Sequence, residues 1–266
     1  MCRHLAYLGE PRTLAEVLTA PEHGLYRQAW EPRHQLHGTV NADGFGVGWY
    51  AEGDPVPARY RRAVPMWADR SFADVARVTR TRCLLAAVRS ATEGMPPDES
   101  AAAPYTSPPG AGQAVGGCWL FSHNGRVEGW PHSLASLAAQ LPASRLLAQE
   151  STVDSALLWA LVLGRLESGQ EPARALAGVA AEAAGLAGGR YNFLLTDGQM
   201  IAATAWGDTL FWRARAGEVL VASEPSDSSG DWQRVPDASV LTAAAGEVLI
   251  QPIDTTVPLT KEATAL

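Results

Sequence analysis

The second residue of this chain is a cysteine, and a cysteine at that place allows a chemistry that an internal cysteine lacks. The sequence opens MCRHLAYLG, so removal of Met1 leaves Cys2 with both a thiol and a free α-amine. The thiolate is the attacking form, and an α-amine, whose pKa is about 7.7–8.0, accepts the thiol proton near neutral pH. Because the side chain of Cys2 is small, we expect an aminopeptidase to remove Met1. Position alone does not establish a function, since most cysteines at the second position have none.

An Asn-Gly pair lies at the end of an apolar run in FSHNGRVEGW. This pair places the amide of Asn124 beside the unobstructed backbone N–H of Gly125. Such donors stabilise an oxyanion, and the loss of one costs an enzyme about 3–4 kcal/mol. The alternative interpretation is a plain turn dipeptide.

Two charged residues have positions that favour ligand binding as much as structure. Arg89 follows an apolar run in AAVRSATEG, where a buried guanidinium meets a carboxylate of the protein or of a ligand. Asp154 lies in the first turn of a helix expected from STVDSALLWALVLGRLESG. It is either an acid that complements the helix dipole or a carboxylate that binds a cationic amine.

The elements that must position these residues are strands at both ends of the chain and helices between them. Strands are expected at 4–9, 45–52, 58–65, 83–89, 118–125, 192–198, 200–206, 209–215, 218–225 and 247–252. Helices are expected at 133–141, at 151–169 with Ser151 or Thr152 as its cap, and at 171–189. Asp197-Gly198 predicts a hairpin turn, and residues 207–210 predict the next reversal. Strands joined by short turns form antiparallel sheets, so we expect an α+β fold of two sheets with helices on their outer faces.

The composition is that of a globular protein without a membrane span. The chain has 266 residues, 47% of them hydrophobic, and a formal net charge of -7. We expect one domain over residues 2–266, because residues 93–117, rich in Pro, Gly, Ala and Ser, are followed by further strands and so form a long surface loop. The absence of a basic stripe argues against nucleic acid, and no apolar stretch approaches the ~20 residues of a membrane helix.

The cysteines and histidines bear on location and on metal binding. Three cysteines and no signal peptide favour a reducing compartment, and we expect a cytoplasmic protein. Cys83 and Cys118 lie in apolar strands and are expected to be buried packing residues. His34 and His37 form an H-x-x-H pair, but a metal site needs three or four ligands. We predict no metal and no other cofactor.

Five short motifs occur in the order seen in class II glutamine amidotransferase domains, which belong to the N-terminal nucleophile (Ntn) hydrolase superfamily. They are CRHLAYLG, NADGFGVGWY, VRSATEG, HNG and STVDS, and NFLLTDG and VASEP extend the similarity towards the C-terminus. Each motif is weak alone, but five in order, beginning at Cys2, resemble this family strongly. The resemblance implies a four-layer αββα sandwich.

The same resemblance implies roles for the residues singled out above. Cys2 resembles the nucleophile that forms a γ-glutamyl thioester, and Asn124 with the Gly125 N–H resembles its oxyanion hole. Arg89 resembles the arginine that binds the α-carboxylate of the glutamyl group, and Asp154 resembles the acid that binds its α-amine.

Further positions match the family less closely. Thr92 corresponds to another contact with the glutamyl group, while Asp43 and Gly44 correspond to a loop that packs behind the nucleophile. Gly129 departs from the pattern, since family members often have Asn there, and this concerns the loop rather than the oxyanion hole.

Longer segments resemble one branch of the family, the amidohydrolases of ergothioneine biosynthesis. These segments are MCRHLAYLG, TVNADGFGVGWY, YRRAVPMWAD, AAVRSAT and FSHNGRVEGWP. That branch removes the glutamyl group from a γ-glutamyl-cysteinyl-hercynine sulfoxide, so the resemblance implies a small-molecule γ-glutamyl substrate. The leaving portion carries a trimethylammonium group, which Trp119 or Trp130 would meet by cation–π attraction, although core packing is the interpretation we favour for both.

The motifs take up nearly the whole chain and leave no room for a synthase domain. This favours a stand-alone amidohydrolase, although a partner subunit could supply a synthase. A stand-alone glutaminase and an ammonia-donating amidotransferase subunit are the alternatives. A non-catalytic γ-glutamyl-binding protein is a third alternative, and the sequence is compatible with a homo-oligomer.

Overall fold

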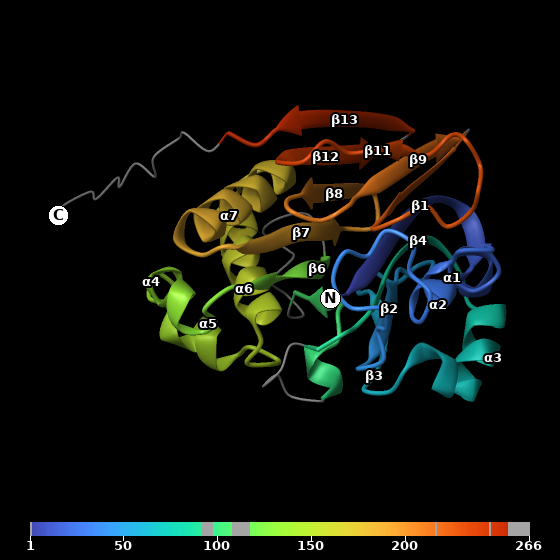
Figure 1. Cartoon of the computed structure of the whole chain (residues 1–266), viewed down its shortest axis with the longest axis horizontal. Helices are drawn as coiled ribbons and strands as arrows, with labels where there is room; N and C mark the ends of the chain where they lie inside the picture. Colours follow the sequence, from blue (N-terminus) through green and yellow to red (C-terminus); the bar gives the residue numbers. More distant parts are fainter. Residues whose placement is uncertain (1, 92–97, 108–117, 216, 245, 255–266) are drawn as a thin grey trace.

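The chain forms two antiparallel sheets that pack face to face between helices (Figure 1). The computed structural model describes residues 2–91, 98–107, 118–215, 217–244 and 246–254. The first sheet has the strand order β11-β9-β10-β1-β4-β2-β3, and the second has the order β13-β12-β8-β7-β6-β5.

The bounds of the elements are as follows. The first sheet contains β1 (Arg3–Thr13), β2 (Phe45–Trp49), β3 (Ala58–Arg62), β4 (Arg80–Val88), β9 (Phe211–Arg215), β10 (Glu218–Ala222) and β11 (Gln233–Arg234). The second contains β5 (Tyr105–Thr106), β6 (Leu120–Val127), β7 (Gly189–Thr196), β8 (Met200–Ala205), β12 (Ser239–Ala244) and β13 (Glu247–Pro252). The helices are α1 (Leu14–Leu18), α2 (Leu25–Gln28), α3 (Arg70–Val78), α4 (Ala135–Ala138), α5 (Ala143–Leu147), α6 (Asp154–Glu167) and α7 (Pro172–Leu186), with short 3₁₀ turns at Met66–Ala68, Glu99–Ala101 and His132–Leu134.

The alternation of side chains along the strands creates three apolar layers. In β1, Leu5 and Tyr7 pack with α1 and α3, whereas Ala6 between them faces the second sheet. The layer between the sheets joins residues such as Leu85 of β4 to Leu194 of β7. A third layer lies between the second sheet and helices α6 and α7. The predicted four-layer αββα sandwich is therefore confirmed.

The two central helices lie where the sequence predicts them, but the cap of the first one differs from the prediction. Helix α6 begins at Asp154, and its N-cap is Val153, which makes no side-chain capping bond. The expected cap at Ser151 or Thr152 is wrong, because Val153 occupies the N-cap position directly before the helix. Helix α7 has Pro172 at its first position and Glu171 as its N-cap, as proline before a helix predicts.

The distribution of strands between the sheets differs from their order in the chain. The Asp197-Gly198 turn does join β7 to β8, with Gly198 at a φ of 92°. The predicted reversal at 207–210 is wrong: the segment crosses from β8 in the second sheet to β9 in the first. It is held there because the Asn192 side chain donates to the backbone oxygens of Asp208 and Thr209 at 3.1 and 3.3 Å.

The segment predicted as a loop over 93–117 contains structure in its described part. Residues 98–107 form a 3₁₀ turn and the short strand β5, which pairs with β6 at the edge of the second sheet. Helices α1 and α3 were also not expected. Residues that favour helix starts do precede them in the sequence: Thr13 and Glu16 form a capping box at α1, and Asp69 caps α3.

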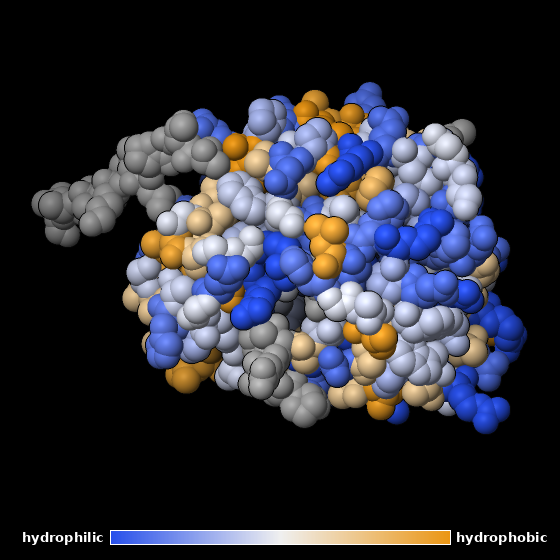
Figure 2. Space-filling model, in the orientation of Figure 1, coloured by the Kyte–Doolittle hydropathy of each residue, from blue (hydrophilic) through white to orange (hydrophobic). Residues whose placement is uncertain are grey.

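On the face shown in Figure 2, hydrophobic side chains are scattered in small groups among hydrophilic ones. Among the described residues, no helix combines the length and the apolar character needed to cross a membrane.

Candidate active site

Strand pairing brings the predicted site residues to one edge of the sandwich. Arg3 pairs with Val88 in the antiparallel ladder of β1 and β4, so Cys2 and Arg89 lie beyond the same end of that ladder. In the second sheet, Asn124 and Gly125 lie near the end of β6, and the first residue of α6, Asp154, contacts the last residue of that strand, Val127, although α4 and α5 lie between them in the chain. One pocket at this edge is lined by Cys2, Arg89, Gly125 and Asp154, together with His123 and small residues that include Ala101, Ala102 and Ala103.

Cys2 is partly exposed in this pocket, and a side-chain hydrogen bond fixes its backbone. The Arg3 Nε donates to the Cys2 carbonyl oxygen at 2.8 Å. Met1 lies outside the described residues, so its removal stays a prediction. Cys2 thus lines the pocket as a free, partly exposed cysteine.

Arg89 is buried and is fixed by the segment at Asp43 and Gly44. The Asp43 N–H donates to the Arg89 carbonyl oxygen at 2.9 Å, the Arg89 N–H donates to the Gly44 oxygen at 2.8 Å, and the Arg89 guanidinium donates to the Asp43 backbone oxygen at 3.3 Å. Gly44 has a φ of 131°, and a Cβ there would lie 2.8 Å from the Arg62 carbonyl oxygen. Asp43 and Gly44 thus support Arg89, and Thr92 lies outside the described residues.

Asp154 is buried between the start of α6 and the end of β6. One carboxylate oxygen accepts from the Val127 N–H at 3.0 Å, and the other accepts from the Ser155 N–H at 2.7 Å. The acid therefore does satisfy backbone donors near the helix start, as a structural interpretation requires. It also lines the pocket beside Cys2.

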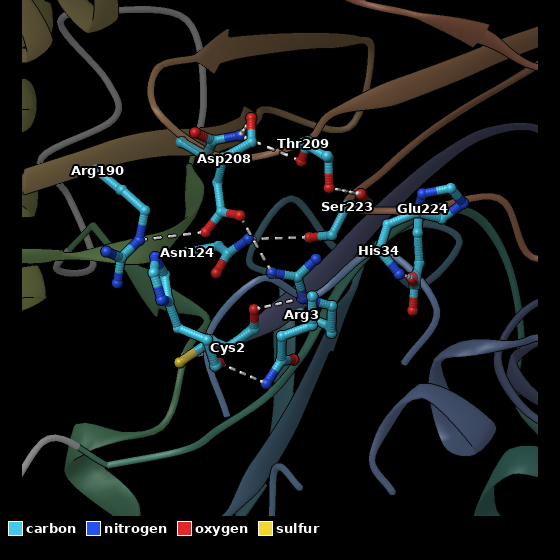
Figure 3. A network of polar contacts seen from close by, with 12 residues as sticks. Cys2, Arg3, His34, Asn124, Arg190, Asp208, Thr209, Ser223 and Glu224 are labelled. Atoms are coloured by element: carbon cyan, nitrogen blue, oxygen red, sulfur yellow. Dashed lines mark hydrogen bonds and ion pairs between the residues drawn. The ribbon is translucent and has the colours of Figure 1, made fainter. Parts of the chain in front are cut away.

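Gly125 is required because no side chain fits at its position. A Cβ there would lie 1.9 Å from the Arg190 carbonyl oxygen and 2.4 Å from the His123 ring. The neighbouring Asn124 is buried, and its Nδ2 donates to the Ser223 Oγ at 3.2 Å (Figure 3). An amide nitrogen carries two hydrogens, and this bond uses one of them; Asn124 itself does not line the pocket.

His123 was not predicted as part of the pocket. Its Nε2 lies 2.9 Å from the Arg190 carbonyl oxygen, which can only accept, so Nε2 carries a proton. Its Nδ1 lies 3.0 Å from the Ser155 hydroxyl, which also lies 3.3 Å from Asp154 Oδ1. Burial lowers the pKa of His123, while the Asp154 charge opposes this. A neutral His123 thus links β6 to β7 and α6, and the sequence offered no spacing signal for it.

Ser223 and Glu224, from the VASEP motif, hold the parts of the site together. The Ser223 Oγ also accepts from the His4 N–H at 3.0 Å. One oxygen of the buried Glu224 accepts from the backbone N–H groups of Arg33 and His34 at 2.8 and 2.6 Å (Figure 3). The sequence links this motif to the family only by resemblance. In the structure, its hydrogen bonds connect a loop and two strands to the end of β10.

The two tryptophans considered for cation binding do not line the Cys2 pocket. Trp119 is buried in the apolar layer beneath α6, and Trp130 packs against that layer. Their core-packing interpretation is therefore the one that the structure supports. Cys83 and Cys118 are buried, as predicted.

Comparison with protein families and curated relatives gives concordant results. The family model of class II glutamine amidotransferases matches residues 25–216. The γ-glutamyl-hercynylcysteine sulfoxide hydrolase of Mycolicibacterium smegmatis is 41% identical over 254 residues, which are 95% of this chain and 100% of that protein. The protein of the same name from Mycobacterium tuberculosis (strain CDC 1551 / Oshkosh) is 39% identical over 96% of this chain and 97% of its own length.

Solved structures show the same architecture at lower identity. A class II glutamine aminotransferase domain protein from Silicibacter pomeroyi has a TM-score of 0.66 and 22% identity, over 95% of this chain and 100% of that one. At this identity the likeness concerns the fold alone.

The burial of the cysteines predicts selective labelling. Burial raises the pKa of Cys83 to about 12, and its Sγ lies 3.2 Å from the Thr196 Oγ1. We expect iodoacetamide to modify Cys2 in the native protein and to leave Cys83 unmodified until urea unfolds the chain, as measured by peptide mass mapping. Labelling of Cys83 at a rate comparable to Cys2 would contradict the burial described here.

The buried histidines predict a loss of stability on acidification. Burial, and then the charges of Arg3 and His123, lower the pKa of His4 well below its ordinary value of 6.5. Below that value the unfolded chain binds a proton that the folded chain excludes, so the free energy of unfolding falls as the pH falls. The slope is at most ~1.4 kcal/mol per pH unit for each such histidine.

Urea unfolding between pH 7 and pH 5 measures this effect. His4→Asn should flatten the pH dependence, whereas the exposed His37, changed to Asn, should leave it as in the wild type. Equal slopes in the wild type and His4→Asn would show that His4 does not resist protonation.

Proposed function

Because the chain belongs to the class II glutamine amidotransferases, we propose that it is an amidohydrolase that cleaves a γ-glutamyl amide with Cys2 as the nucleophile. One observation carries the proposal: a partly exposed cysteine, a buried arginine and a buried aspartate line the same pocket. A γ-glutamyl group presents a carbonyl, a carboxylate and an ammonium, which are the groups that these three residues complement.

The reaction follows from the chemistry of a cysteine with a free α-amine. With Met1 removed, the amine takes the thiol proton and Sγ attacks the γ-carbonyl carbon. The C–N bond then breaks, the amine nitrogen of Cys2 returns the proton to the leaving amine, and a γ-glutamyl thioester remains. Water adds to the thioester, glutamate leaves, and the thiol is restored.

Asn124 and Gly125 supply the donors for the negative charge that develops on the carbonyl oxygen. The Asn124 amide hydrogen that does not bind Ser223 and the Gly125 N–H act together in this role. Arg89 pairs with the α-carboxylate of the substrate, and Asp154 with its α-ammonium. Both charges are preorganised by backbone hydrogen bonds, so little ordering is needed when the substrate binds.

The substrate class proposed is the γ-glutamyl-hercynylcysteine sulfoxide that names the curated relatives. The reaction would then release hercynylcysteine sulfoxide and glutamate in ergothioneine biosynthesis. The near-complete overlap with these relatives supports a stand-alone hydrolase. We further propose that the enzyme works in the cytoplasm, where its thiol stays reduced.

Competition between two substrates tests the proposed specificity. With the hercynyl conjugate and glutamine supplied together, we expect mass spectrometry to show release of hercynylcysteine sulfoxide well ahead of ammonia from glutamine. Equal turnover would point to a general glutaminase instead. The intact mass should lack the initiator methionine, and Cys2→Ala should abolish product formation while still binding substrate.

Arg89 and Asn124 are expected to affect different steps. Arg89→Ala should mainly raise KM, because it removes a contact made in the ground state and in the transition state alike. Asn124→Ala should mainly lower kcat, by about 100-fold, because it removes an oxyanion donor. Steady-state kinetics would refute the assignment if the two effects were exchanged.

A further inference from the structure

The residue that follows the nucleophile is a completely buried arginine. The Arg3 side chain is 0% exposed, and its Nε donates to the Cys2 carbonyl oxygen at 2.8 Å. Burying a guanidinium is costly unless a carboxylate compensates it. Burial accordingly lowers the pKa of Arg3, while the charges of Asp208 and Glu224 oppose that shift.

The compensating carboxylate belongs to Asp208, in the segment that crosses between the sheets. Asp208 Oδ1 lies 3.6 Å from Arg3 Nη2, and its Oδ2 lies 3.4 Å from Arg190 Nε (Figure 3). Arg3 is on β1 of the first sheet and Arg190 on β7 of the second, so the acid joins the two sheets electrostatically. Its own backbone is fixed by the Asn192 side chain.

Cys2 needs such support because the strand ladder stops before it. The pairing of β1 with β4 begins at Arg3 and Val88, one residue after Cys2. The oxyanion donors lie on the other sheet, on β6. The thiol and the donors are thus carried by different sheets, and their relative position depends on contacts that cross between them.

We propose, on the basis of the function proposed above, that Arg3 and Asp208 are positioning residues whose buried ion pair fixes the backbone of Cys2 relative to the oxyanion donors. Both side chains are fully buried and neither lines the pocket, so both act through the position of Cys2. Their effect is on the rate of acylation, since a displacement of about 1 Å at reacting atoms lowers a rate by roughly 100-fold.

The molecule contains a control for the loss of a buried arginine. Arg213 on β9 is also nearly buried, in the same sheet, and it pairs with Asp227 at 2.5 Å without contacting Cys2. A purely structural effect of removing a buried arginine should therefore be shared by Arg3→Met and Arg213→Met.

The test compares kcat, KM and melting temperature in these variants with the hercynyl conjugate as substrate. We expect Arg3→Met to lower kcat by about 10- to 100-fold with little change in KM, and Arg213→Met to keep the wild-type kcat. Arg3→Lys should recover part of the rate, because lysine retains the charge but lacks the planar fork. Asp208→Asn, which keeps the size of the side chain, replaces Arg3→Met if that variant does not fold.

Two results would overturn the proposal. One is wild-type kcat in folded Arg3→Met or Asp208→Asn, and the other is an equal loss of kcat in Arg213→Met. Failure of the proposed function is distinguishable from either, because the wild type would then not hydrolyse the hercynyl conjugate, or Cys2→Ala would still hydrolyse it, whatever the behaviour of Arg3.

Discussion

The apolar contact between the two sheets determines where every group of the site lies. Leu85 and Ala6 on one sheet pack with Leu120 and Leu194 on the other. Burial of each leucine stabilises this layer by about 2 kcal/mol. Since Cys2 and Arg89 adjoin strands of the first sheet whereas Asn124 and Gly125 belong to the second, the pocket exists only while this layer is intact. The polar contacts around Cys2 refine a position that the apolar layer establishes.

The polar groups at this edge form a network in which each member holds another. Ser223 bridges the backbone of His4 and the amide of Asn124, and His123 bridges Ser155 and the backbone of Arg190. These groups are buried, and a buried donor or acceptor is costly when it lacks a partner. Small residues such as Gly125 leave the space that the network needs. The result is a preorganised pocket, and the few charged groups that line it have opposite charges.

Local patterns in the sequence predicted what depends on local contacts. The two central helices, the Asp197-Gly198 turn and the antiparallel character of the sheets follow from spacing, caps and turn residues. The family motifs indicated Cys2, Arg89, Gly125 and Asp154, which the fold brings into one pocket.

The rest depends on contacts between distant parts of the chain. Nothing in the spacing indicates that residues 207–210 cross between sheets, or that Asp208 meets Arg3 some 200 residues earlier. The capping residues of α1 and α3 can be recognised in the sequence, because Thr13 and Asp69 are of the types that begin helices. Both helices are short, however, and they lack the long apolar periodicity that predicts a helix.

The central place of β1 in its sheet has a consequence for synthesis on the ribosome. β1 emerges first, yet it pairs with β10 near the other end, where Leu5 lies opposite Ala222, and His4 bonds to Ser223, 219 residues away. A strand that waits for so distant a partner is paired late, because non-local contacts form slowly. Cys2 therefore stays accessible on the nascent chain after β1 has emerged, and it is enclosed only once β10 has been translated.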